Sequence, residues 1–172
     1  LLQEKNKPVQ VAIRLKLENG EITEIDHMIW RSITEPMPEG LLKARPGLVQ
    51  KLDPAERVSR EEMFKAANAY YDAIEQSDGT VAPFADECER HEGGVTAANN
   101  QAPVPAGSDT TFGAMAPFGR LKCGEQLSTG IMRYISDINQ RRLVAIDEEM
   151  GLVMIFSMFN HDGEPNPLPI IN

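Results

Sequence analysis

The chain has 172 residues, 41% hydrophobic and 25% charged, with a formal net charge of −9. These values are typical of a globular protein, and the length is sufficient for one core with additional segments. Because acidic residues outnumber basic ones by 26 to 17, and because no basic stripe is interleaved with aromatic residues, a polyphosphate partner would be repelled and nucleic-acid binding is not expected.

Two features bear on the compartment. No apolar run approaches the roughly 20 residues of a membrane helix, so no membrane insertion is expected. The first residues, Leu1 to Lys5, are too short and too charged for a signal peptide, which predicts a cytoplasmic protein.

Cys88 and Cys123 are too few for a disulfide framework. We expect two free thiols, one buried, over the alternative of a strand-to-helix bridge in an oxidising compartment.

Residues 8–31 alternate between apolar and polar side chains around Asn19-Gly20 and predict a β-hairpin. With these two residues as the loop, four pairs share one face: Leu17 with Ile22, Leu15 with Glu24, Ile13 with Asp26, and Val11 with Met28. An inward Asp26 would have a pKa raised by desolvation and would be a candidate functional carboxylate. The alternative is that the strand end twists outward and leaves Glu24 and Asp26 in water.

A helix is predicted to begin after Ser59, because Ser59 and Glu62 match the capping-box pattern S-x-x-E. At 100° per residue, one narrow stripe faces the core, with Tyr70 at its centre and Tyr71 at its edge. The stripe consists of Met63, Ala67, Tyr70 and Ile74.

A strand is predicted from Phe84 to Glu92, after the turn at Asp78-Gly79. Successive side chains of a strand alternate between its faces. Cys88, Arg90 and Glu92 therefore share one face, which carries a carboxylate beside a guanidinium, while His91 lies on the other.

This helix and strand resemble the SnoaL-like polyketide cyclases and ketosteroid isomerases, the superfamily with the cone-shaped fold of nuclear transport factor 2. The shared pattern is a Tyr-x-x-x-(Ile/Leu) helix, an acidic turn, and an aromatic-Ala-Asp-acidic strand whose ninth residue is acidic. The resemblance implies an α+β fold with a curved, mostly antiparallel sheet wrapped around N-terminal helices. It also implies Glu92 as general base, Tyr70 as donor to an enolate oxygen, no cofactor, and a homodimer.

A second resemblance, to a little-characterised branch of tandem proteins in bacteria and fungi, spans residues 57–162. Its motifs are Cys-x-Arg-His-Glu-Gly-Gly from Cys88 and Arg-Arg-x-Val-x-x-Asp-Glu-Glu-x-Gly-Leu-Val from Arg141. In the superfamily a hairpin like that of residues 8–31 comes last, whereas here it comes first. We therefore expect residues 1–34 to finish a preceding domain, the proline-rich residues 35–56 to form a linker, and residues 57–172 to form a SnoaL-like domain. The alternative is that the hairpin completes the later sheet, in the same chain or in a neighbour.

The remaining elements are a long loop at 93–118, a short helix at 118–127, and a hairpin of 142–147 with 152–160 around Gly151. The strand Leu152–Phe159 is apolar on both sides, which predicts cover on both faces. In the superfamily one such face covers a hydrophobic pocket and the other meets a second subunit.

A carboxylate and a phenol across a pocket suffice for proton transfer next to a carbonyl. We therefore expect an isomerase, cyclase or lyase acting on a small apolar carbonyl, polyketide, terpenoid or aromatic compound. Glu92 would be the base, Tyr70 the donor, and Arg90 and His91 assistants; the predicted substrate contacts are Tyr71, Phe84, Cys88, Tyr134, Phe156, Met158 and His161. The alternatives are a structural Arg90–Glu92 pair and a non-catalytic ligand-binding or dimerisation domain. No metal is expected, because Asp86, Cys88 and His91 are split between the two strand faces.

Overall fold

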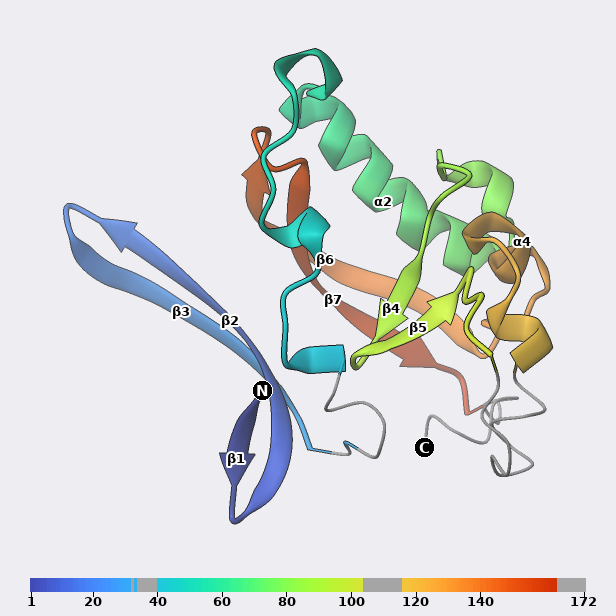
Figure 1. Cartoon of the computed structure of the whole chain (residues 1–172), viewed down its shortest axis with the longest axis horizontal. Helices are drawn as coiled ribbons and strands as arrows, with labels where there is room; N and C mark the ends of the chain where they lie inside the picture. The colour runs from blue at the N-terminus through green and yellow to red at the C-terminus, as the bar shows by residue number, and fades with distance from the viewer. Residues whose placement is uncertain (32, 34–39, 104–115, 164–172) are drawn as a thin grey trace. The chain divides into compact units, whose positions relative to one another are not determined.

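The computed structural model describes residues 1–31, 33, 40–103 and 116–163 of the chain. It has antiparallel sheets and few helices (Figure 1), so the predicted α+β class is confirmed. The chain divides into two compact units: a smaller one with Leu1–Pro46 and His91–Val95, and a larger one with Gly47–Arg90 and Thr96–Asn172. Among the described helices, none is both long and apolar enough to cross a membrane.

The smaller unit contains a three-stranded antiparallel sheet in the order β1-β2-β3. Its strands are β1 (Leu2–Glu4), β2 (Lys7–Glu18) and β3 (Glu21–Trp30). Asn19 and Gly20 connect β2 to β3 with φ values of 54° and 85°. These two residue types adopt this left-handed backbone with the least strain. The predicted hairpin and its turn are therefore confirmed.

The register of this hairpin differs from the predicted one beyond its first pair. Leu17 lies opposite Ile22 as predicted, but a bulge follows, after which Lys16 lies opposite Glu24 and, two residues further, Arg14 lies opposite Asp26. The predicted pairs Leu15–Glu24, Ile13–Asp26 and Val11–Met28 are wrong, because Thr23 is an extra residue in β3 and a one-residue shift moves every later partner. The shift places basic side chains opposite acidic ones and Leu15 opposite Ile25.

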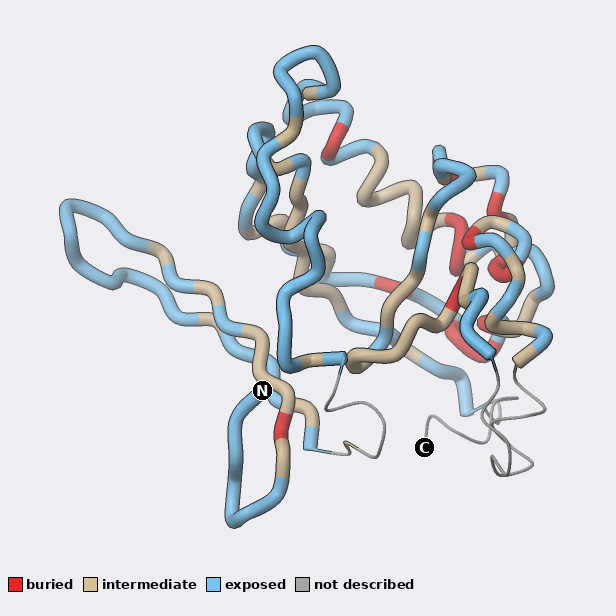
Figure 2. The backbone as a smooth tube through the Cα atoms, viewed as in Figure 1, coloured by how far each residue is buried: buried red, intermediate tan, exposed pale blue. Residues whose placement is uncertain are grey.

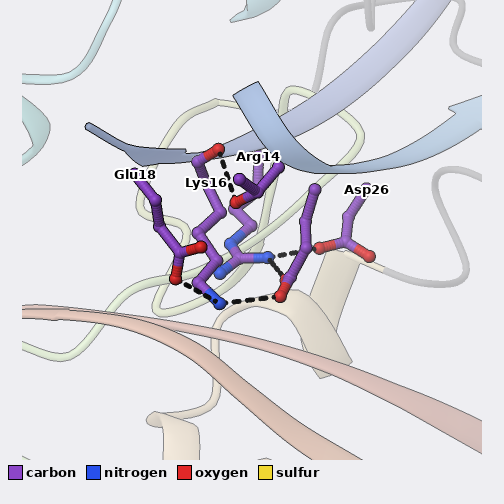
Figure 3. A network of polar contacts seen from close by, with 6 residues as sticks. Arg14, Lys16, Glu18 and Asp26 are labelled. Carbon is purple, nitrogen blue, oxygen red and sulfur yellow. Dashed lines mark hydrogen bonds and ion pairs between the residues drawn. The ribbon is translucent and has the colours of Figure 1, made fainter. Parts of the chain in front are cut away.

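Charged side chains consequently gather on one face of the hairpin (Figure 3). Arg14 contacts Glu24 at 2.5 Å and Asp26 at 2.9 Å, and Lys16 contacts Glu24 at 2.9 Å and Glu18 at 3.1 Å. Asp26 therefore lies against a guanidinium, neither inward among apolar side chains nor fully solvated as the two predictions required; its side chain is 16% exposed. Hydrogen bonds from Arg14 and, to a smaller extent, from Lys16 hold the pKa of Glu24 below its usual value.

The larger unit carries helix α2 and the second hairpin, β6–β7. The elements from residue 46 onward are η1 (Pro46–Leu48), η2 (Pro54–Glu56), α2 (Arg60–Gln76), η3 (Gly79–Val81), β4 (Arg90–Glu92), β5 (Val95–Ala98), α4 (Cys123–Ser128), β6 (Ile135–Asp147) and β7 (Leu152–His161). Ser59 and Glu62 form the predicted capping box. The second hairpin is also confirmed, with a β6 that starts earlier than predicted.

Two predictions around β4 are wrong. Only Arg90–Glu92 of the predicted segment forms a strand, because Asp86 and Glu87 form a turn. The Cys88 amide closes this turn by donating to the Ala85 carbonyl at 3.1 Å. Aspartate is favoured in such turns. The predicted loop at 93–118 includes β5, which pairs with β4 across Gly93-Gly94, both with positive φ. Residues 104–115 of that loop, like residues 35–39 of the predicted linker, lie outside the described residues.

The core of the larger unit forms where α2 and α4 meet the start of β6 (Figure 2). Of the predicted helix stripe, Met63 and Ile74 are buried, whereas Ala67 and Tyr70 are half-buried. The buried cluster consists of Ala73, Ile74, Ala82, Leu127, Met132, Tyr134, Ile135 and Ile138. Burial of such apolar surface stabilises the fold by about 25 cal/mol per Å².

Strand β7 is less covered than predicted. Its residues from Leu152 to Ser157 are half-buried, but Met158 and Phe159 are 52% and 42% exposed. The prediction of cover on both faces along the whole strand is therefore wrong at these two residues, because adjacent side chains lie on opposite faces of a strand and both are exposed.

Arg141 joins helix α2 to strand β6. A bulge lies between Asn139 and Arg142, with Gln140 at a φ of 49°, and the guanidinium of Arg141 contacts Asp72 at 2.5 Å and Glu75 at 2.8 Å. The other Glu75 oxygen accepts from the backbone amide of Ile138. The guanidinium also lies 5.2 Å from the centre of the Tyr71 ring. These contacts fix the helix on the strand at one point.

Arg141→Met is expected to destabilise the larger unit, because it removes the hydrogen bonds of the guanidinium to two carboxylates and to the Ile138 carbonyl oxygen while keeping the aliphatic stem. The arginine side chain is 20% exposed, so solvent screens the pairs only in part, and the loss is about 1–2 kcal/mol. In thermal unfolding followed by circular dichroism this is a fall of roughly 2–8 °C. The control is Arg133→Met at an exposed position, and equal melting temperatures for the two variants would contradict the assignment.

Candidate functional site

Helix α2 and the residues after η3 bring three aromatic side chains together. The Tyr70 ring lies 5.7 Å from that of Tyr71 and 6.2 Å from that of Phe84, which it meets edge-on. Tyr71 in turn meets Phe159 of β7 edge-on at 6.0 Å. Tyr70, Tyr71 and Phe84 are half-buried against the core. We call these three residues the aromatic group.

Local sequence explains how Phe84 returns to the helix. Ser77 ends α2 in the left-handed conformation, and Asp78 caps η3 by accepting from the Thr80 amide at 2.8 Å. Asp78 also accepts from the Thr80 hydroxyl at 2.7 Å, and the hydroxyl and then the amide lower the pKa of its carboxyl. Gly79 then passes so close to Gly124 that a Cβ would lie 2.0 Å from the Gly124 carbonyl oxygen. Glycine is therefore required where η3 meets α4.

Gln126 of α4 is the fully buried polar residue of this region, with 0% exposure. Its side-chain oxygen accepts from Arg90 Nε at 2.9 Å, and its nitrogen donates to the carbonyl oxygens of Ala97 and Phe118 at 2.6 and 3.1 Å. Both ends of the amide thus have partners, as burial requires. Gln126 therefore ties Arg90 and β5 to the helix.

Sequence reasoning missed Gln126. A signal was present, because Cys123, Gln126 and Leu127 follow the i, i+3, i+4 spacing of a helix face, and all three are buried. A glutamine on such a face must find hydrogen-bond partners inside the protein.

Cys88 and Cys123 form a disulfide, with their Cα atoms 6.0 Å apart. The expectation of two free thiols is wrong, because the turn before Cys88 brings it to the first residue of α4. The two residues are 35 positions apart, and closing a loop of that length stabilises a fold by about 3–4.7 kcal/mol in the chain-entropy account. Cys88 therefore offers a disulfide sulfur, not a thiol, to any ligand.

The same segment has two further polar ties. Lys122 contacts Asp86 at 2.6 Å, and this hydrogen bond lowers the pKa of the Asp86 carboxyl. The Asn99 side-chain amide donates to the Cys88 carbonyl oxygen at 3.1 Å. Asp86 and Cys88 are thus engaged with other partners, and within the described ranges no three His, Cys, Asp or Glu residues gather as metal ligands.

The residues of β4 are divided between the two units. Arg90 belongs to the larger unit, whereas His91 and Glu92 belong to the smaller one. Arg90 and His91 are half-buried and Glu92 is exposed. The predicted opposition of Tyr70 and Glu92 joins residues of different units and stays a prediction, as does the Arg90–Glu92 pair.

The other predicted substrate contacts lie in separate places on the larger unit. Tyr134 is buried and meets the exposed His161 edge-on at 5.3 Å, and its hydroxyl donates to the Met132 sulfur at 3.9 Å. Phe156, under the guanidinium of Arg142 at 5.7 Å, and Met158 lie on the face of β7 opposite Phe159 by strand alternation. Of the predicted site residues, the structure therefore brings Tyr70, Tyr71 and Phe84 together, whereas the predicted substrate contacts on β7 lie apart from them.

The larger unit is thus a small α+β domain built from one long helix, an antiparallel hairpin and a disulfide-linked segment. Comparison with known protein families shows the family to which the chain belongs. The model of the family described as "Domain of unknown function (DUF8021)" matches residues 56–171, so the chain belongs to this family. No curated protein and no solved structure matches the chain.

Gln126→Met is expected to loosen β4 and β5, because the Arg90 guanidinium and the carbonyl groups of half-buried Ala97 and Phe118 lose their shared partner. Each hydrogen bond of this kind contributes about 0.5–1.5 kcal/mol, so the loss of all three should lower the melting temperature by roughly 4 °C or more. Amide hydrogen exchange should rise at residues 90–98. The matched control is Gln76→Met at the exposed end of α2. Unchanged exchange at 90–98 would show that Gln126 does not hold these strands.

Proposed function

We propose that residues 57–172 form a SnoaL-like, ketosteroid-isomerase-like domain with the cone-shaped fold. It catalyses isomerisation, cyclisation or a retro-aldol type cleavage of a small, largely apolar carbonyl, polyketide, terpenoid or aromatic compound without a cofactor. The observation that supports this most is Tyr70, a half-buried phenol whose ring is held between Tyr71 and Phe84. Aromatic rings beside a phenol suit an apolar ligand that carries one polar oxygen.

In this proposal Glu92 removes a proton from the carbon next to the substrate carbonyl. The electron pair left behind moves onto the carbonyl oxygen, and Tyr70 donates a hydrogen bond to the resulting oxyanion. Returning the proton from the Glu92 carboxyl to another carbon completes an isomerisation. Ketosteroid isomerases pair a carboxylate base with a phenol donor in the same way.

Arg90 and His91 assist in different ways. The hydrogen bond from Arg90 to buried Gln126 sets the position of the guanidinium, which would orient an acidic or phenolic group of a substrate. His91 is half-buried, and its imidazole would carry a proton between substrate atoms as a general acid or base.

Glu92→Gln should abolish turnover while the melting temperature stays within a few degrees, because an exposed carboxylate contributes little to stability. The assay is solvent deuterium incorporation into a panel of enones, β-diketones and cyclic polyketide precursors, followed by mass spectrometry. A loss of roughly 10²- to 10⁴-fold is expected for a general base. The control is Glu87→Gln, at an exposed position before β4. Full activity in Glu92→Gln would remove the proposal.

Tyr70→Phe tests the oxyanion donor without the unknown substrate. The probe 2-naphthol carries an aromatic ring system and a phenolic oxygen that resembles the oxygen of an enolate. It should therefore bind near Tyr70, and the fluorescence of the probe should change on binding. A hydrogen bond to a charged group contributes about 1.5–3 kcal/mol, so the dissociation constant should rise roughly 10- to 100-fold in the variant. Circular dichroism checks that the variant is folded. Equal affinity for the two proteins would argue against Tyr70 as donor.

A second candidate is a non-catalytic domain of the same class, used for ligand binding or homodimerisation. The exposure of Glu92 favours it, because a general base acts best where water is excluded. Strand β7 favours it too, because it exposes one large apolar side chain on each face, Met158 and Phe159. A wild-type protein that binds 2-naphthol but exchanges no deuterium would favour this candidate.

A further inference from the structure

We propose that the Cys88–Cys123 disulfide is a clasp that orders the segment around Arg90 against α4, so the domain reaches its functional form only in an oxidising compartment. This inference concerns folding and location and does not depend on the reaction proposed above. It replaces the expectation of a cytoplasmic protein, because disulfides persist in oxidising compartments and are rare in the cytosol.

Two cross-links join the same two segments. The disulfide connects Cys88 to Cys123, and a hydrogen bond connects Arg90, two residues later, to Gln126, one helical turn later. A covalent bond that fixes the first pair leaves the second pair little freedom to separate. The disulfide therefore holds in place the contact that positions Arg90.

The non-covalent ties are too weak to replace it. The Lys122–Asp86 ion pair has side chains that are 53% and 86% exposed, and exposed pairs of this kind contribute little. Residues 83–89 form no strand, and α4 has six residues, far fewer than a helix needs to be stable by itself. Without the disulfide, the side-chain bonds between residues 83–90 and α4 with its cap would be the exposed ion pair and the hydrogen bond from Arg90 to Gln126.

Bond formation requires an oxidant of the disulfide class, such as oxidised glutathione. The Cys88 thiolate attacks that disulfide and releases one thiol, and the Cys123 thiolate then attacks the mixed disulfide and releases the second. Two thiols of the protein are oxidised and one small disulfide is reduced to two thiols. Because Cys123 is 2% exposed in the folded chain, the bond should form during folding and then resist reductant.

The experiment compares the full chain refolded with a mixture of reduced and oxidised glutathione against the same chain refolded with dithiothreitol. Alkylation of free thiols before and after reduction counts the disulfide. Amide hydrogen exchange then reports on residues 84–98 and on α4. The reduced chain should exchange faster in these two segments, with α2 still protected, and should melt roughly 5–15 °C lower.

The variant Cys88→Ser separates the loss of the bond from other effects of reductant. It should match the reduced wild-type chain in both exchange and melting temperature, and dithiothreitol should change it no further. Free thiols in the chain refolded with glutathione, or equal exchange of the oxidised and reduced chains at 84–98, would overturn the proposal. Loss of protection throughout α2 would also overturn it, because the bond would then be a requirement of the whole fold and not a clasp on one segment.

Discussion

The contact between Arg141 and one turn of α2 is the interaction on which the larger unit depends. The guanidinium meets Asp72 and Glu75 and lies over Tyr71, so one side chain gives a specific position to a helix that otherwise packs on β6 through apolar contacts. The bulge at Gln140 makes this contact available while Ile138 and Leu143 remain paired with β7. Because Tyr70 and Tyr71 belong to that helix, the aromatic group takes its position from the same contact.

Specific links, rather than regular structure, hold the other side of the unit. The segment before β4 and the short helix α4 have few backbone hydrogen bonds of their own, and they are joined by a disulfide and by the amide of Gln126. A buried amide with all its partners is stable, but the loss of one partner leaves a polar group unsatisfied. The residues that position Arg90 are therefore sensitive to single substitutions, whereas the exposed ion pairs of Lys16 with Glu18 and Glu24 on the hairpin β2–β3 are not.

The hairpin β2–β3 shows how one residue decides which side chains meet. Thr23 shifts the pairing by one position, which brings Arg14 opposite Asp26 and leaves apolar side chains such as Leu15 and Ile25 on the other face. These apolar residues are exposed in the single chain, and a small sheet of this kind is marginally stable unless its apolar face is covered. The charged face, by contrast, satisfies its own groups through the network around Arg14.

Local patterns in the sequence determined the elements whose signals lie within a few residues: the Asn19-Gly20 turn, the capping box of Ser59 and Glu62, the long helix with Tyr70 on its inner side, and the second hairpin. Tertiary structure alone decided the disulfide, the hydrogen-bond partners of Gln126, the bulges at Thr23 and Gln140, and the contact of Arg141 with α2. Each of these depends on which distant segments meet, for example residues 88 and 123. Periodicity reports which face of an element is apolar, but it carries no information about the partner that covers that face.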